Sequence, residues 1–186
     1  MELRKHINKL LEKKGDTYEK GAVMLYFSFP ELLHIHDSIM PGDLYTEEDE
    51  DRSYGYEDEA HTTLLYGVGP DVEVRDIENI VTGYTFGTCK LHNASLFTTN
   101  PNYDVLKFDV EGEPLHQVHQ ELKSIPYESD FPNFHPHLTI AYIQKGLGQK
   151  YASIIKKKYQ EILLVPQYIV YSAGDGSQNK INIRID

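Results

Sequence analysis

The stretch HPHLTIAYI, residues 135–143, decides the fold of this chain. Its β-branched and aromatic residues, its lack of acidic and lysine or arginine side chains and the proline near its start predict a buried β-strand. Because successive side chains of a strand point to opposite faces, His137 and Thr139 should share one face with Ala141. The other face should carry the residues between and after them, Leu138, Ile140 and Tyr142. An imidazole and a hydroxyl are therefore expected to project together from an apolar strand.

A second copy of this pattern lies earlier in the chain, in AHTTLLYG, residues 60–67. His61 and Thr63 should again share one face of a strand. A single His-x-Thr on a strand is a weak signal, but two of them, each leading an apolar strand, are hard to attribute to chance. Burying two imidazoles for packing alone would leave ring nitrogens in need of partners. The paired motifs therefore predict a functional site where the two strands meet.

The elements predicted around the motifs occur in the same order twice, as strand, helix, motif strand and helix. Their ranges are 21–29, 30–40, 60–67 and 72–82, then 103–110, 113–125, 135–143 and 149–161. Strands with turns are predicted at 84–97, and a final hairpin at 162–172 and 180–185. This order predicts an α+β domain over residues 1–186, with two lobes, mainly antiparallel sheets that form a central cleft, and helices outside. The motif strands should meet along a pseudo-two-fold axis, and residues 1–20 should form an N-terminal helical extension.

Two further histidines lie on the first predicted helix of each half, four in all. His34 and His36 are expected at the solvated surface of their helix. His116 and His119 lie on or beside an apolar stripe, which favours partly buried helix residues over ligands.

The acidic segment, residues 43–59, holds nine Asp or Glu and one Arg. Charge blocks of this kind are usually solvated loops, so a surface loop is the simpler interpretation. A lid is the alternative, because the segment leads directly into His61 and carries three tyrosines.

The net charge of −11, from 29 acidic and 18 basic residues, bears on the ligand class. Proteins that hold long nucleic acids usually present a basic face, so a small anionic ligand fits this chain better. No apolar run approaches the roughly 20 residues needed to span a bilayer, and the first 14 residues do not resemble a secretory signal. The single cysteine, Cys89, excludes an internal disulfide. A cytoplasmic protein without membrane or long nucleic-acid partners is expected.

Two histidines on facing strands, each beside a hydroxyl, suit phosphodiester cleavage. A neutral imidazole can take the proton of the attacking hydroxyl or water, and a protonated one can donate to the leaving oxygen. The threonines can donate hydrogen bonds to non-bridging phosphate oxygens, where charge builds in the transition state. This scheme needs no metal ion and no other cofactor.

The motifs His61-Thr62-Thr63 and His137-Leu138-Thr139 resemble the paired H-x-T/S signatures of the 2H phosphoesterase superfamily, which includes 2′-5′ RNA ligase-like and cyclic phosphodiesterase proteins. The surrounding PHLTIAYI, HTTLLYG and YDVLKFDV look most like the phage-encoded branch that contains anti-CBASS phosphodiesterases, over about residues 21–185. The resemblance implies a metal-independent hydrolase with a bilobal fold. It also implies an acid/base pair, His61 and His137, and two phosphate donors, Thr63 and Thr139.

For that branch the resemblance implies cyclic di- and oligonucleotide immune signals as substrates, opened at a 3′-5′ linkage by the neighbouring 2′-hydroxyl. Such an enzyme would counter a host defence, in the host cytoplasm if phage-encoded. Aromatic residues hold the bases in that branch, which makes Tyr26 the first candidate here and Phe97 the second. Lys107 and His135 complete the predicted substrate-binding set. A tryptophan expected in some relatives is absent from this chain.

Three alternatives stay open. A phosphodiesterase for 2′,3′-cyclic phosphates of RNA ends or nucleotides would use the same four motif residues. A zinc hydrolase could bind its metal through His135, His137 and His61, although no Asp, Glu or Cys is obviously placed to complete that site. A non-catalytic sponge would only sequester nucleotide. The bases read, the ring size and the oligomeric state are left undetermined.

Overall fold

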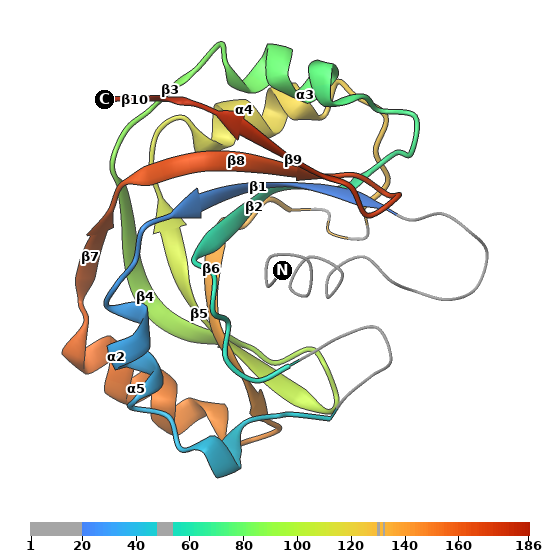
Figure 1. The fold of residues 1–186 in the computed structure, drawn as a ribbon. Helices are drawn as coiled ribbons and strands as arrows, with labels where there is room; N and C mark the ends of the chain where they lie inside the picture. Colours follow the sequence, from blue (N-terminus) through green and yellow to red (C-terminus); the bar gives the residue numbers. More distant parts are fainter. Residues whose placement is uncertain (1–19, 48–53, 130, 132) are drawn as a thin grey trace.

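The computed structural model describes residues 20–47, 54–129, 131 and 133–186 (Figure 1). The helix predicted in the N-terminal extension and the centre of the acidic segment lie outside the described residues.

Within the described residues, eight strands form two antiparallel sheets of four strands each. The first sheet has the order β2 (His61–Val68), β1 (Gly21–Phe27), β8 (Pro166–Ser172) and β9 (Gln178–Asn182). The second has the order β6 (His137–Gln144), β5 (Tyr103–Glu111), β4 (Cys89–Phe97) and β7 (Glu161–Leu164). A short parallel pair joins β3 (Thr85–Phe86) and β10 (Arg184–Ile185). Each motif strand ends the order of its sheet, and the two motif strands contact each other.

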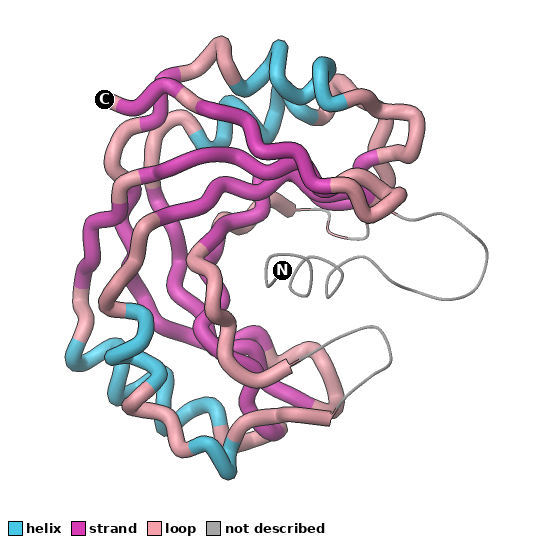
Figure 2. Tube along the Cα trace, viewed as in Figure 1, coloured by secondary structure: helices cyan, strands magenta, loops and turns pink. Residues whose placement is uncertain are grey.

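The helices lie outside the curved, C-shaped body of strands (Figures 1 and 2). They are α2 (Leu32–His36), α3 (Val74–Val81), α4 (Leu115–Leu122) and α5 (Gly148–Lys158), with a short 3₁₀ turn, η1 (Pro41–Asp43). Two of them cross between the lobes. Helix α2 follows β1 in the chain but packs against β6 of the other sheet, and α4 follows β5 but packs against β2. The same crossing thus occurs twice, as a pseudo-two-fold relation requires.

The larger hydrophobic core runs between the outer faces of the sheets and the helices, and a smaller cluster of Ala22, Met24, Tyr26 and Val170 lies on the other face of β1. The apolar residues of the central strand β1 explain its position, because all seven of its residues are buried. Fully buried core residues come from both lobes, among them Leu25, Leu64, Phe108 and Ile140. The predicted α+β fold, with mainly antiparallel sheets and helices outside, is confirmed.

Each motif strand contains a β-bulge directly after its threonine. In β6, Thr139 pairs with Lys107 and Ala141 pairs with Leu106, so Ile140 is the extra residue. In β2, Leu64 is the extra residue in the same way, because Thr63 pairs with Met24 and Leu65 pairs with Val23. A bulge of this kind shifts the side-chain alternation by one position.

The bulge corrects the face predicted for the second half of β6. The alternation holds from His137 to Thr139 and then reverses, so that Ala141 lies fully buried in the core. Tyr142, predicted to share the core face, instead packs against the rings of Tyr54 and Tyr103. The strand 135–143 was thus predicted correctly, but strict alternation along it was wrong.

Two other predictions are corrected. The strand predicted at 162–172 is two strands in different sheets, since the chain leaves β7 at Leu164 and enters β8 at Pro166. His36, expected at the solvated surface, is only 6% exposed. A helix that packs against the other lobe buries a side chain that its own sequence does not mark as buried.

Candidate active site

The contact between β2 and β6 brings the two His-x-Thr motifs together. Each histidine is the first residue of its motif strand. His61 is buried, and His137 and the two threonines are half-buried. The two rings are close enough for the charge of His61 to affect the pKa of His137. The two motif strands therefore meet, as the sequence predicted.

Both catalytic candidates are held by the same hydrogen bond. The Nδ1 of His61 donates to the carbonyl of Glu59 at 2.9 Å, and the Nδ1 of His137 donates to the carbonyl of His135 at 2.8 Å. Because a carbonyl can only accept, Nδ1 must carry the hydrogen in each ring. Nε2 is then the nitrogen that gains and loses a proton. The motif strand and the residue two positions before it thus fix both the orientation and the tautomer of each ring.

The surroundings of His137 favour its neutral form. Burial, with smaller effects of the charges of Lys107, His61 and His135, lowers its pKa to about 4, against the opposing effect of the bond to the His135 carbonyl. Lys107 lies opposite Thr139 in the register and is only 4% exposed. A buried cation beside an imidazole penalises a second positive charge. His137 is therefore unprotonated at neutral pH.

An ionic network around the buried Lys107, which the sequence did not predict as a unit, lies beside His137. Asp109 accepts hydrogen bonds from Lys107, from His135 Nε2 at 2.9 Å and from Asn93 Nδ2 at 2.6 Å. Although burial opposes ionisation, these donors lower the pKa of Asp109 to about 2. The available signal was the spacing of Lys107 and Asp109 on one face of β5, where Asp109 lies opposite His137. Of the predicted binding residues, Lys107 and His135 both belong to this network.

Tyr26, the first predicted stacking residue, lies directly opposite His61 in the sheet. One face of its ring stacks on His61 at 5.4 Å between centroids, and Tyr168 stacks on it at 5.3 Å. The Nζ of Lys180 lies 3.8 Å from the centroid of Tyr168 and extends this row to a fourth strand. Tyr26 is only 3% exposed and its hydroxyl is buried, so with both ring neighbours in place it offers a ligand no free surface, and the stacking role predicted for it does not fit this structure. A base could stack on it only if His61 or Tyr168 moved.

Phe97, the second predicted stacking residue, contacts the rings of His135 and His137. Its ring meets that of His137 edge-on, with 4.8 Å between centroids and planes at 90°. The Nζ of Lys107 lies over the same ring, 4.8 Å from its centroid. Phe97 therefore contacts both His137 and Lys107. Its role in substrate binding stays a prediction.

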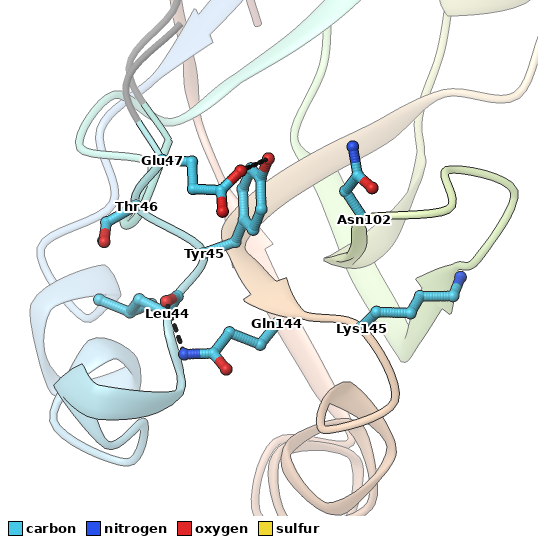
Figure 3. Close-up of a pocket in the computed structure, with 7 residues that line it drawn as sticks. All are labelled: Leu44, Tyr45, Thr46, Glu47, Asn102, Gln144 and Lys145. Carbon is cyan, nitrogen blue, oxygen red and sulfur yellow. Dashed lines mark hydrogen bonds between the residues drawn. The ribbon is translucent and has the colours of Figure 1, made fainter.

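A hollow of about 380 Å³ lies at the far end of β6, away from the histidines (Figure 3). Tyr45, Asn102 and Gln144 are among the residues that line it. Its polar groups already serve the fold, since the Gln144 amide donates to the carbonyl of Gly42 at 2.8 Å.

Backbone hydrogen bonds join the two described flanks of the acidic segment to β6. The N–H of Tyr45 donates to the carbonyl of Tyr142, and the N–H of Glu57 donates to the carbonyl of Ile140. The predicted lid, whose centre is not described, stays a prediction.

Two further properties concern the described residues alone. They contain no cluster of three or more His, Cys, Asp or Glu side chains arranged to hold a metal ion. The Nε2 of His135, one of the three ligands considered for zinc, is engaged by Asp109. None of the described helices is long and apolar enough to cross a membrane.

Comparison with known proteins yields a structural likeness. No family model matches the chain, and no curated protein matches it in sequence. Among solved structures, the chain is similar to Usb1 from Kluyveromyces marxianus with uridine monophosphate, with a TM-score of 0.54 and 9% sequence identity. The match covers 88% of this chain and 97% of that one. The likeness concerns the fold, and it agrees with the predicted two-lobed α+β arrangement.

Proposed function

We propose that this chain is a metal-independent phosphodiesterase in which His61 and His137 exchange protons with the substrate. The observation that supports this most is the repeated arrangement: two contacting motif strands, each with an Nδ1-anchored histidine, a threonine two positions on and a bulge after it. A packing role for the two histidines would not need both rings to share one tautomer and one anchor.

The lowered pKa of His137 supports the base role for His137 and leaves the acid role to His61. His137 Nε2 takes the proton of the attacking oxygen, which forms a bond to phosphorus. The bond from phosphorus to the leaving ribose oxygen breaks, and protonated His61 supplies the proton that this oxygen needs. Thr63 and Thr139 donate hydrogen bonds to the non-bridging oxygens, and the cation of Lys107 adds electrostatic stabilisation.

The substrate class that we favour is the 2′,3′-cyclic phosphate of an RNA end or a nucleotide, attacked by water. The fold is shared with a protein whose structure was solved with uridine monophosphate, a single nucleotide. The net charge of −11 also favours a small substrate over a long polyanion.

The second candidate substrate is a cyclic di- or oligonucleotide signal. It rests on the resemblance of the motif surroundings to the anti-CBASS branch. Here the attacking group would be the 2′-hydroxyl beside the 3′-5′ linkage, and the same four motif residues would act.

A panel of substrates tests both candidates. Uridine 2′,3′-cyclic phosphate, an RNA ending in a 2′,3′-cyclic phosphate, and cyclic di- and trinucleotides are each incubated with the protein in excess EDTA, and the products are separated by chromatography. We expect ring opening of the 2′,3′-cyclic phosphates, and much slower ring opening with His137→Ala. Opening of the larger rings instead would establish the second candidate.

Other outcomes of the same panel would contradict the proposal. Intact nucleotide recovered from a stable complex would identify a sponge. Activity that disappears with EDTA and returns with Zn²⁺ would identify a zinc hydrolase.

A further inference from the structure

Two histidines outside the candidate active site contact the bulges of the motif strands. In α2, His36 Nε2 donates to the carbonyl of Ile140 at 3.0 Å. In α4, His119 Nδ1 donates to the carbonyl of Leu64 at 2.7 Å. These carbonyls belong to the two extra residues, each directly after a motif threonine. Residues 104 and 55 positions apart in the chain thus make the same contact in the two lobes.

The surroundings of the two helix histidines also match. His36 stacks on Tyr56 with 4.5 Å between ring centroids, and His119 stacks on Phe134 with 4.0 Å. Each aromatic partner comes from the segment just before a motif strand. Burial lowers the pKa of both His36 and His119, so both rings are neutral donors at neutral pH. The agreement of donor, acceptor and stacking partner in two lobes with dissimilar sequences points to a shared role.

The bulges expose carbonyls that can accept a hydrogen bond from a side chain. A bulge interrupts the ladder between strands, and a buried carbonyl without a donor is unfavourable. At Ile140 the backbone N–H of Glu57 also donates, at 2.9 Å, so His36 is the second of two donors there. Because a bulge directs the neighbouring side chain, the donor that fixes the carbonyl also fixes the direction of the threonine before it.

We propose that His36 and His119 are positioning residues, which hold the hydroxyls of Thr139 and Thr63 in place through the bulges. Neither histidine needs to touch substrate. The catalytic consequence rests on the proposed function, in which the two hydroxyls bind different non-bridging oxygens of one phosphate. The positional claim does not depend on activity and can be tested without it.

Amide isosteres supply matched variants. Gln places its amide nitrogen near the position of histidine Nε2, and Asn places it near the position of Nδ1. His36→Gln should therefore keep the bond to Ile140, and His36→Asn should lose it. At His119 the order is reversed, so that Asn should keep the bond to Leu64 and Gln should lose it.

The first arm records backbone amide and threonine methyl NMR signals of the full chain. We expect His36→Asn to shift the signals of Thr139 and Ile140 and to leave those of Thr63 in place, and His36→Gln to stay near wild type. His119→Gln should shift the signals of Thr63 and Leu64 instead. Unchanged threonine signals in folded His36→Asn and His119→Gln would overturn the proposal. Equal shifts for Gln and Asn at one position would also overturn it.

The second arm uses the two diastereomers of uridine 2′,3′-cyclic phosphorothioate, in which sulfur replaces one or the other non-bridging oxygen. We expect His36→Asn and His119→Gln each to lower kcat about 10- to 100-fold, with KM changed less than about twofold. The ratio of rates for the two diastereomers should move in opposite directions in the two variants. A general loss of folded protein would lower both rates equally and leave the ratio unchanged, which would contradict a positioning role.

The two arms separate the two proposals. A wild-type protein that cleaves no phosphodiester would refute the proposed function, while the NMR arm would still decide whether His36 and His119 position the threonines.

Discussion

At the scale of single residues, the two hydroxyls of the first motif lie in different environments. Thr63 is half-buried and shares the face of His61, whereas Thr62 is fully buried on the core side. The Thr62 hydroxyl has no hydrogen-bond partner in the described part of the chain. Two adjacent threonines therefore provide a test and its control.

We expect Thr63→Val, and likewise Thr139→Val, to lower kcat by about 10²–10³, because each removes one donor to the transition-state phosphate. Thr62→Val should leave kcat unchanged and keep or raise the free energy of unfolding by up to about 1 kcal/mol, since it removes a buried unpaired hydroxyl. Steady-state kinetics and chemical denaturation of the three variants measure this. Equal losses of kcat in Thr62→Val and Thr63→Val would mean that Thr63 is not the only threonine of this motif that faces the substrate, and our assignment of the strand faces would be wrong.

The buried cation beside His137 should be visible in the pH dependence. His137 acts as a base only when neutral, so kcat/KM should rise with pH through its lowered pKa of about 4, and the acidic limb should lie there. Lys107→Met removes a positive charge that lowers this pKa. Its removal favours the protonated imidazole, so the acidic limb should move to higher pH.

The matched control for that experiment is Lys157→Met, which removes an exposed lysine of α5. Its acidic limb should coincide with that of wild type. A Lys107→Met profile that also coincides with wild type would exclude an electrostatic role for Lys107.

At the scale of elements, a third bulge shapes the site. It lies in β4 between His92 and Ser95, and Asn93 within it has a positive φ of 51°. The side chain of Asn93 bonds Asp109 on one side and accepts from Lys156 on the other, at 2.9 Å. The bulge therefore connects α5 to the network beside His137.

Substitutions at Asn93 separate its backbone from its side chain. Asn93→Gly keeps the left-handed backbone but loses both side-chain bonds, whereas Asn93→Ala also imposes strain of about 1–2 kcal/mol. We expect both variants to lower kcat to a similar degree, and only Asn93→Ala to lose the additional stability in thermal denaturation. If the activity of Asn93→Gly equals that of wild type, the network does not depend on this side chain.

The same scale explains which elements could be predicted from sequence. The motif strands and the helices were predictable because their residue patterns are local. The bulges at Leu64 and Ile140 were not, since a bulge depends on a pairing partner far away in the chain. The burial of His36 had no local signal for the same reason, because its acceptor lies 104 residues away. In the candidate site, the paired motifs identified His61 and His137, but Asp109 and Asn93 became apparent only from the pairing of β4, β5 and β6.

At the scale of the whole molecule, each lobe contributes half of the candidate site. One motif comes from each sheet, and each sheet is supported by a helix that crosses from the other lobe. The proposed base and acid are therefore held by separate sheets, and in the proposed mechanism proton transfer to and from one phosphate needs both halves at once. Residues that act as such a unit show strongly non-additive kinetic effects.

We expect His61→Ala and His137→Ala each to lower kcat by about 10²–10⁴, and the double variant to lose little more than either single one. His92→Ala is the control, because His92 is a half-buried histidine of β4 whose Nε2 lies 3.8 Å from a carboxylate oxygen of Glu111. It should leave kcat unchanged. Single-turnover rates on one substrate, with all variants checked for folding, give the comparison. Losses that multiply in the double variant would mean that the two histidines act in independent steps, and the paired acid/base mechanism would have to be replaced.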